Sequence, residues 1–279
     1  MDDTALVLGS GGLTGVGWEI GILHGLAEAG VDVTDAALVI GSSAGSVVGV
    51  NIGARPGGLG ELYERQLASP RGETGASLGP GRIFRYARAL LTSRTPEAYG
   101  VKLGRMALAA PAPAESERRA VIAERLLSHE WPERALRITS VAVDTGELRV
   151  FDRDSGVPLV DAVAASCAVP LVWPPVTIEG RRWMDGGLHS TANAQLAAGC
   201  RRVVIIAPSP QGGGPLESPA AQAARLTAEG ARVVLITPDA AAKKAFGRGT
   251  LDPARRAPAA RAGLAQAPAH ADAVKALWG

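Results

Sequence analysis

The feature that most constrains this chain is a glycine-flanked serine placed directly after an apolar run. Residues 36–40 are all apolar, the run ends in Gly41-Ser42-Ser43-Ala44-Gly45, and a helical pattern of small residues follows at once. Centred on Ser43, the sequence reads G-x-S-x-G, the strand–turn–helix corner at which a serine hydroxyl is pushed outward. Gly41 and Gly45 are expected there because a Cβ at either position would collide with the other arm of the corner. The alternative for so short a match is an ordinary flexible turn.

A second glycine-rich turn lies closer to the N-terminus. Residues 5–8 are apolar without alternation, which is typical of a strand buried on both faces, and they lead into the glycine-rich stretch 9–17. A helical pattern follows over 18–29 and stops at Gly30. Backbone amides exposed at such a helix start bind phosphate or an oxyanion. The first fifty residues are therefore expected to form a βαβα unit with both turns at strand ends, where parallel sheets place ligands.

The rest of the chain predicts further strands of an α/β fold, interleaved with helices. Residues 55–135 are expected to form a helical wall or cap beside the site, and 238–279 a basic, Ala-rich helical extension. The basic face of this extension is interpreted as solvated, with contact to anionic lipid headgroups as the alternative. The expected helices are 60–69, 82–92, 96–109, 116–128, 157–165 and 192–198, and the expected strands are 137–143, 147–151, 176–178, 181–184, 203–207 and 233–237.

Length, charge and cysteine content exclude several classes of protein. A chain of 279 residues suits one large α/β domain, and a net charge of +2 argues against a dedicated nucleic-acid binder. Cys167 and Cys200 form neither a disulfide framework nor a metal-binding spacing, and are expected to be small core residues. The pattern of a secretory signal, a basic segment followed by an apolar one, is not seen, so no such signal is expected. No apolar run reaches the roughly 20 residues that cross a bilayer. A cytoplasmic protein is the resulting expectation.

A nucleotide-binding alternative uses the first turn. Gly11, Gly15 and Gly17 also fit G-x-x-x-G-x-G, the dinucleotide loop of short-chain dehydrogenases, with Asp32 or Asp35 as the acid that binds the ribose. This alternative needs a tyrosine and a lysine four residues apart, a spacing that none of the three tyrosines shows, and it leaves Ser43 without a role. A phosphate-binding Walker A loop is excluded because the chain contains no Gly-Lys-Ser/Thr.

A second alternative is an α/β-hydrolase triad, which needs a histidine base late in the chain. None of the four histidines, His24, His129, His189 and His270, lies in a distinctive context. A carboxylate can replace the histidine. Asp185, in Asp185-Gly186-Gly187 at a predicted strand end, is such a base if partial burial raises its pKa, and is otherwise an ordinary turn residue.

Taken together, the three motifs resemble the patatin-like phospholipase family. The family has a glycine-rich loop after the first strand, then G-x-S-x-G, and much later D-G-G or D-G-A. Here these are residues 10–15, 41–45 and 185–187, and the segments 165–170 and 173–176 are also similar to the family. The likeness covers the first 55 residues and about 137–207.

The resemblance implies a three-layer α/β/α fold over 1–279, with a mostly parallel sheet and helices on both faces. It also implies that a Ser–Asp dyad hydrolyses acyl esters of lipids without metal or organic cofactor. Ser43 would be the nucleophile and Asp185 the base, with Gly41, Gly45, Gly186 and Gly187 as motif glycines. The amides of Gly11, Gly12 and Leu13 would form the oxyanion hole.

The chain departs from the family pattern within the first loop. Leu13 replaces the third glycine, and Gly15 stands where the family carries a basic residue. Because the loop is altered, a non-catalytic family member that binds lipid or acyl groups is the alternative interpretation. The expected partners are a lipid or acyl-ester substrate and a membrane touched peripherally by the middle helices or the basic tail, with no nucleic acid. The oligomeric state is not determined by the sequence.

Overall fold

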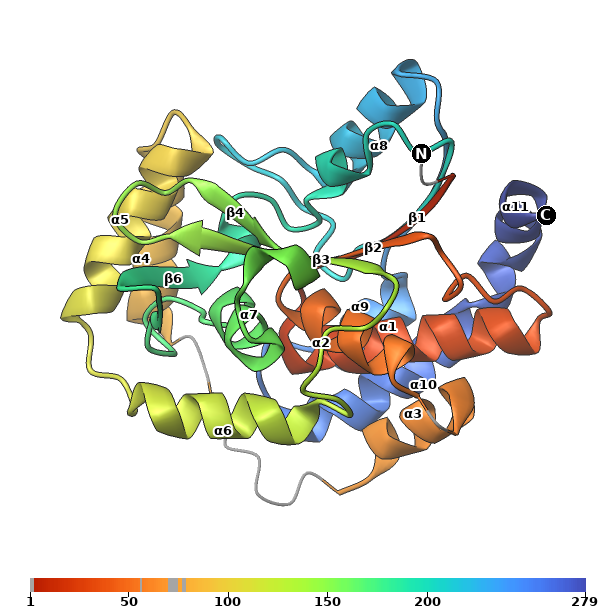
Figure 1. Cartoon of the computed structure of the whole chain (residues 1–279), viewed down its shortest axis with the longest axis horizontal. Coiled ribbons are helices and arrows are strands. Elements are labelled where there is room, and N and C mark those ends of the chain that lie inside the picture. Colours follow the sequence, from red (N-terminus) through yellow and green to blue (C-terminus); the bar gives the residue numbers. More distant parts are fainter. Residues whose placement is uncertain (1–2, 56, 70–74, 77–78) are drawn as a thin grey trace.

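A mostly parallel sheet forms the centre of the computed structural model, which describes residues 3–55, 57–69, 75–76 and 79–279 (Figure 1). Within the described residues the sheet has eight strands in the order β5-β6-β3-β2-β1-β7-β8, with β4 paired to β3. Neighbours from β3 to β8 pair in parallel, whereas β4 and β6 are antiparallel to β3, and β5 is antiparallel to β6. The strands are β1 (Thr4–Leu8), β2 (Leu38–Gly41), β3 (Ala135–Ala142), β4 (Leu148–Phe151), β5 (Val176–Ile178), β6 (Arg181–Asp185), β7 (Arg202–Ile206) and β8 (Arg232–Ile236).

Helices cover both faces of this sheet, as the fold-class prediction requires. Alternate residues of β1, such as Leu6 and Val7, belong to two separate apolar cores, one on each face. Helices α1, α2 and α7 share the larger core and α8 the smaller one (Figure 1). The helices are α1 (Gly12–Glu28), α2 (Ala44–Gly53), α3 (Gly58–Leu67), α4 (Pro80–Leu91), α5 (Pro96–Ala109), α6 (Glu115–Arg125), α7 (Leu159–Ser166), α8 (Pro219–Ala228), α9 (Ala240–Phe246), α10 (Arg256–Gln266) and α11 (Pro268–Trp278).

Most of the predicted elements are confirmed, with three differences. Helix α1 begins at Gly12 and not at residue 18, because the glycines after Gly12 are part of the helix and not of a loop. The helix expected over 192–198 is a 3-10 turn, η3 (Ala194–Ala197). The C-terminal extension is divided into α9, α10 and α11 by breaks at residues 247–255 and 267. Parts of the helical segment expected over 55–135, namely 56, 70–74 and 77–78, lie outside the described residues.

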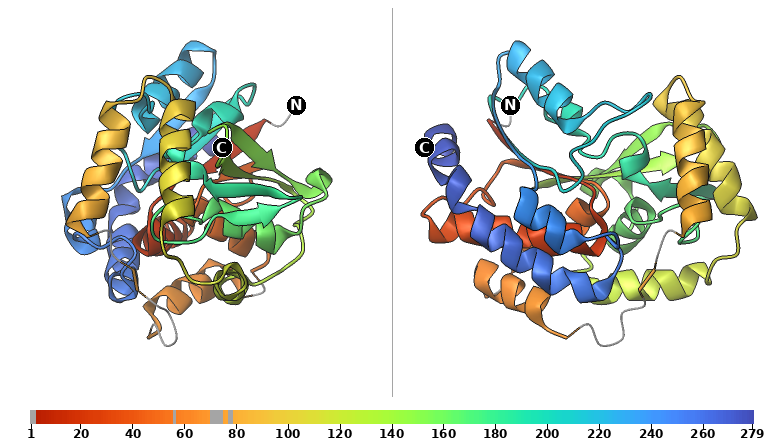
Figure 2. Two further views of the ribbon diagram at one scale, coloured as in Figure 1. Left: turned by 90° about the vertical axis from the view of Figure 1, so that its left-hand side faces the viewer. Right: turned by 180° about the vertical axis from the view of Figure 1, so that it is seen from behind.

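The helices of the 55–135 segment surround the sheet at different places. Helix α3 packs on α1 and α10, and α6 packs on α7. Helix α5 packs on β3, and α4 packs on α5, so that these two stand side by side at one end of the molecule (Figure 2). The segment thus consists of separate helices that pack on different parts of the fold.

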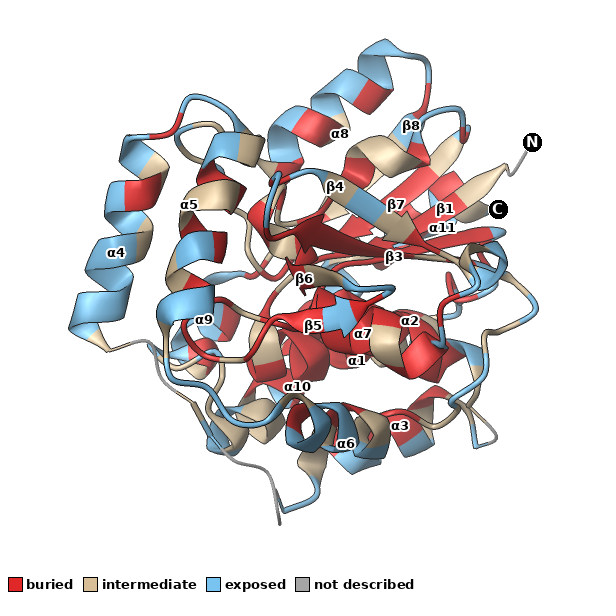
Figure 3. Cartoon of the chain, turned by 60° about the vertical axis from the view of Figure 1, so that its left-hand side comes forward, coloured by how far each residue is buried: buried red, intermediate tan, exposed pale blue. Residues whose placement is uncertain are grey.

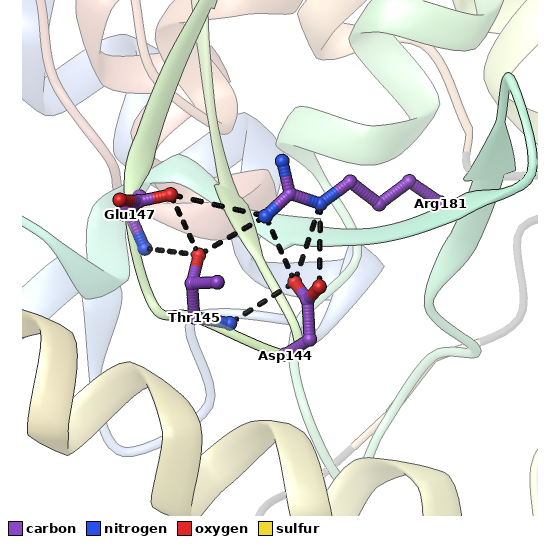
Figure 4. A network of polar contacts seen from close by, with 4 residues as sticks. All are labelled: Asp144, Thr145, Glu147 and Arg181. Carbon is purple, nitrogen blue, oxygen red and sulfur yellow. Dashed lines mark hydrogen bonds and ion pairs between the residues drawn. The ribbon is translucent and has the colours of Figure 1, made fainter.

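An arginine from β6 holds the turn between β3 and β4 (Figure 4). The Arg181 guanidinium donates to Asp144 Oδ1 at 3.2 Å and to Thr145 Oγ1 at 3.2 Å, and it lies 3.8 Å from Glu147 Oε2. Its hydrogen bond to Asp144 lowers the pKa of that carboxyl. Since these groups are solvent-exposed, the network orders the turn and contributes little to the free energy of unfolding.

The C-terminal extension is integral to the core, because α10 packs closely along α1. A Cβ added at Gly21 would lie 2.2 Å from the Ala260 carbonyl oxygen, and one at Gly263 would lie 2.3 Å from the Trp18 carbonyl oxygen. Only glycines allow the two backbones to approach to this distance. The side of α10 that carries Ala259, Ala260 and Gly263 is therefore buried, whereas Arg261 is exposed.

We expect Gly21→Ala to destabilise the protein by about 2 kcal/mol or more, because the new methyl group must push α10 away from α1. The matched control is Gly60→Ala on α3, where a Cβ would meet only the His24 ring, at 3.7 Å. This control should be neutral or stabilising by up to about 1 kcal/mol, since alanine favours helix more than glycine does. Urea unfolding of both variants measures the difference, and equal midpoints would contradict the packing described here.

Candidate active site

Ser43 occupies a strained corner between β2 and α2. Its φ of 52° and ψ of −111° lie in a region that residues with a Cβ rarely adopt. A Cβ at Gly41 would lie 2.7 Å from Ser46 Cα, as expected for a clash with the helical arm. A Cβ at Gly45 would instead lie 2.0 Å from the Leu8 carbonyl oxygen, so this glycine is required by the neighbouring strand β1. The corner is therefore packed into the sheet and is not a flexible turn.

Side chains from two helices hold the backbone of Ser43. Its amide donates to Ser166 Oγ at 2.9 Å, at the end of α7. Its carbonyl oxygen accepts from Ser46 Oγ at 2.6 Å and from Cys167 Sγ at 3.3 Å. All three of these residues are buried, so the strained conformation is fixed by the surrounding structure. Sequence reasoning assigned no role to Ser166 or Ser46, because hydroxyls that bind backbone have no signature in the sequence.

The Ser43 hydroxyl faces the Asp185 carboxylate across 142 residues of sequence. Ser43 Oγ donates to Asp185 Oδ2 at 2.7 Å, and Gly187 N donates to Asp185 Oδ1 at 2.8 Å. Strand β3 brings the two together, since it pairs with the end of β2 at Ile138 and with the end of β6 at Ser140. The predicted nucleophile and base are thus in direct contact.

Burial makes Asp185 a stronger base than an exposed aspartate. The residue is 6% exposed, and its burial raises the pKa of the carboxyl to about 6. The hydrogen bonds from Ser43 and Gly187 and the positive charge of Arg118 act in the opposite direction and limit the rise. A carboxylate with a pKa near 6 is ionised at neutral pH and still accepts a proton more readily than an ordinary aspartate.

A buried polar cluster lies behind the contact and joins the two motifs. Ser42 Oγ and Thr139 Oγ1 are 2.6 Å apart, and Asn193 Nδ2 donates to Ser42 Oγ at 2.9 Å. Asn193 Nδ2 also lies 3.1 Å from the Gly186 carbonyl oxygen, so one amide group spans the serine corner and the D-G-G turn. Asn193 and Thr139 were missed by sequence reasoning. Asn193 adopts a φ of 54°, a left-handed conformation in which asparagine is enriched.

Gly12 and Leu13 line the same cavity as Ser43, and Gly11 precedes them as the N-cap of α1. Amides in the first turn of a helix have no intrahelical acceptor and are therefore able to hold a negative oxygen. Gly12 adopts a φ of 61°, whereas the backbone at Leu13 is helical and needs no positive φ. The leucine in place of the third glycine is thus compatible with a loop of this shape.

The loop is anchored from the C-terminal extension. Thr14 N donates to the Thr250 carbonyl oxygen at 3.1 Å, and a Cβ at Gly12 would lie 2.6 Å from the same oxygen. Gly15, where the family carries a basic residue, faces Ala44, and a Cβ added there would lie 3.1 Å from the Ala44 methyl group. The segment around Thr250 thus contacts the loop directly, a contact that sequence reasoning missed.

The cavity beside Ser43 is small and mostly apolar. It has a volume of about 30 Å³ and adjoins a larger one of about 390 Å³ that shares Leu13, Val16, Val47 and Arg125 with it. The guanidinium of Arg118 lies over the Trp173 ring, 3.9 Å from its centroid, at the wall of the smaller cavity. The site therefore offers an apolar surface together with two arginines.

The residues of the two alternative interpretations do not form the sites that those interpretations require. His189 lies with Glu97 and Glu147 at a separate depression, and its pKa is lowered by burial. Gly15 and Gly17 lie inside α1 and form no nucleotide loop. Asp32 accepts hydrogen bonds from Thr34 N and from Arg55, and Asp35 accepts one from the Trp278 indole.

Comparison with known families agrees with this geometry. The sequence profile described as patatin-like phospholipase matches residues 6–198. The chain belongs to the patatin-like phospholipase family. Membership supports a lipid hydrolase activity in general, and the central sheet with helices on both faces is consistent with the patatin-like fold.

Solved structures show a distant likeness to this patatin-like chain. VipD from Legionella pneumophila has a TM-score of 0.49 and 14% identity, over 98% of this chain and 67% of VipD. The type III effector protein ExoU has a TM-score of 0.43 and 15% identity, over 98% of this chain, which spans about half (53%) of ExoU. No curated protein matches the sequence.

Two further features of the patatin-like structure concern metals and membranes. Among the residues that the structure describes, no three histidine, cysteine, aspartate or glutamate side chains gather as a metal site would require. None of the described helices combines the length and the apolar composition needed to cross a bilayer.

The raised pKa of Asp185 predicts a pH-dependent cost to stability. Between pH 3.8, the ordinary value, and about 6, the folded protein holds a proton that the unfolded chain has released, so the free energy of unfolding falls as pH rises. Asp185→Asn removes this loss, and its free energy of unfolding relative to wild type should increase across the window by about 2 kcal/mol. Urea unfolding from pH 4 to 7 measures the difference.

Asp144→Asn is the matched control for this experiment. The pKa of Asp144 is lowered by Arg181, so its removal should produce no relative gain over the same window. An unchanged difference between Asp185→Asn and wild type from pH 4 to 7 would contradict the burial of an ionisable carboxyl at this site.

Proposed function

We propose that this protein is a serine acyl hydrolase that acts on lipid esters through a Ser43–Asp185 dyad. The observation that carries the proposal is the 2.7 Å hydrogen bond from Ser43 Oγ to a buried carboxylate whose pKa is raised to about 6. A serine is a weak nucleophile until a base accepts its proton, and Asp185 is placed to do so. Phospholipids, lysophospholipids and simple acyl esters are the candidate substrates.

The first half of the reaction forms an acyl-enzyme. Asp185 takes the proton of the Ser43 hydroxyl as Oγ attacks the ester carbonyl carbon, and the carbonyl oxygen becomes negatively charged. We expect the amides of Gly11, Gly12 and Leu13, at the N-terminus of α1, to stabilise the charge on that oxygen. Collapse of this intermediate breaks the ester C–O bond, and the proton on Asp185 passes to the leaving alcohol.

The second half releases the fatty acid. Asp185 takes a proton from a water molecule, whose oxygen attacks the acyl carbon of the Ser43 ester. The same amides stabilise the second tetrahedral intermediate, and the proton returns to Ser43 Oγ as the carboxylic acid leaves. One carboxylate therefore serves as base and then as acid in both halves, and no cofactor is needed.

The lining of the cavity suits an acyl chain. Val16, Val47, Val169, Trp173 and Leu251 present apolar surface next to Ser43. Burying apolar surface contributes about 25 cal/mol per Å², so each methylene that enters this space strengthens binding. The adjoining cavity between α1, α2, α3 and α6 shares Leu13 and Val47 with it and is lined by polar as well as apolar side chains.

We expect a fluorophosphonate probe to label the wild type covalently and to leave Ser43→Ala unlabelled, since the probe reacts only with an activated serine. Labelling is read by in-gel fluorescence or by the intact mass, and heat-unfolded wild type is the negative control. A wild type that stays unlabelled, while it binds fatty acid, would favour the non-catalytic acyl-binding member of the family over the hydrolase.

Hydrolysis of a soluble p-nitrophenyl ester should depend on the ionised form of Asp185. Because the protonated form of Asp185 cannot act as a base, kcat/KM should fall tenfold per pH unit below pH about 6 and be level above it.

Asp185→Asn should lower kcat by roughly 10²–10⁴-fold. His189→Ala is the matched control and should retain the activity, since this side chain faces Glu97. Loss of activity in the histidine variant alone would indicate a histidine triad.

A further inference from the structure

Helix α4 presents apolar side chains to solvent. Phe84 is 68% exposed, Leu91 81% and Ile83 56%, and on α5 Leu108 is 55% exposed. These are the large exposed apolar side chains of the described residues, and all lie on the α4–α5 pair. Figure 3 shows α4 pale blue over most of its length, at the outer edge of the molecule.

The exposed apolar side chains form a stripe along one side of α4. Ile83, Phe84, Ala87 and Leu91 are spaced by three, four and seven residues, which places them on one face of a helix. Ala89, the buried residue of α4, lies on the opposite face. The helix thus packs through Ala89, Tyr86 and Leu90 and still leaves a second apolar side exposed to solvent, unlike an ordinary surface helix.

Positive charge flanks this stripe. Helix α4 carries Arg82, Arg85 and Arg88, all exposed, and no acidic residue. Over residues 79–111 the sequence has six basic side chains and one acidic one, whereas the whole chain has a net charge of +2. An apolar stripe bordered by arginines is complementary to a bilayer surface that contains anionic lipid.

The helix is connected to the wall of the site. Tyr86 Oη donates to the Pro170 carbonyl oxygen at 2.8 Å. Pro170 follows Cys167, which donates to the backbone of Ser43, by three residues. A groove of about 520 Å³ between α4 and α5 has Phe84, Arg85, Arg88 and Met106 on its sides and reaches Leu171.

We propose that α4 is the membrane-docking element of this protein, and that it lies in the surface of a bilayer containing anionic lipid. The stripe of Ile83, Phe84, Ala87 and Leu91 enters the interface, while Arg85 and Arg88 contact the phosphates of lipid headgroups. Docking places the segment around Pro170, beside Ser43, next to the lipid. This inference deepens the proposed function. The part of it that takes membrane lipid as the substrate rests on the proposed hydrolase activity.

Two other arrangements are less consistent with the structure. A second copy of the chain seated on α4 about a twofold axis would bring the arginines of both copies together, and like charges would oppose the contact. The basic C-terminal extension has the cations Lys243 and Lys244 exposed, but none of its large apolar side chains over 238–279 is exposed, and Phe246 packs edge-on against Trp18. It therefore offers charge without an apolar surface to insert.

The test measures co-sedimentation of the full chain with vesicles of diether phosphatidylcholine, with or without 30% diether phosphatidylglycerol. Diether lipids contain no ester bond, so binding is measured even if the proposed hydrolysis fails, and hydrolysis of soluble esters tests the chemistry separately. Phe84→Ser/Leu91→Ser should weaken binding to the anionic vesicles by about 30-fold or more. Arg85→Gln/Arg88→Gln should weaken it by about tenfold, and added salt should abolish this difference.

Lys243→Gln/Lys244→Gln is the matched control and should bind as the wild type does. Thermal unfolding of each variant verifies the fold, which substitutions at exposed positions should leave intact. Wild-type protein that does not bind the anionic vesicles would overturn the proposal, as would binding that depends on Lys243 and Lys244 alone. A dimer in solution that Phe84→Ser/Leu91→Ser dissociates would assign the stripe to a second copy and would equally overturn it.

Discussion

The site depends on one contact, the hydrogen bond between the Ser43 hydroxyl and the Asp185 carboxylate at 2.7 Å. It joins two segments that are far apart in sequence, and it needs both partners held in place at once. The serine is held in a strained backbone conformation by Ser166, Ser46 and Cys167, and the aspartate is held by Gly187. The strain and the burial of the carboxylate both cost stability, and the packed core around the sheet offsets that cost.

The remainder of the fold serves to bring the turns of three strands together. Strands β1 and β2 are parallel neighbours, so their C-terminal turns lie at the same edge of the sheet. Strand β6 enters antiparallel to β3, which places Asp185 beside the end of β2. The close approach of α10 to α1 then fixes the helix whose first turn contains Gly12 and Leu13, so the C-terminal extension supports the cavity beside Ser43.

The polar cluster and the charged groups around Ser43 and Asp185 set the electrostatic environment of these two side chains. Asn193, Ser42 and Thr139 satisfy one another in a buried space, and a buried polar group without a partner would cost roughly 1–3 kcal/mol. Arg118 stabilises the ionised form of Asp185 and so limits the rise in its pKa. Burial and charge therefore act in opposite directions on the same carboxyl, and their balance leaves it ionised at neutral pH.

The sequence by itself determined the α/β class, most of the strands and helices, and the three glycine motifs that carry Ser43, Asp185 and the loop at Gly11–Leu13. It did so because both kinds of signal are local. A buried strand appears as a short apolar run, and a turn too crowded for a side chain appears as glycine. Only the tertiary structure decided that Gly45 is required by Leu8 of another strand, that Thr250 anchors the first loop, and that Ser166 and Asn193 hold the site. These contacts join residues separated by about 40 to 240 positions, and their partners are selected by strand order and burial, which no local pattern encodes.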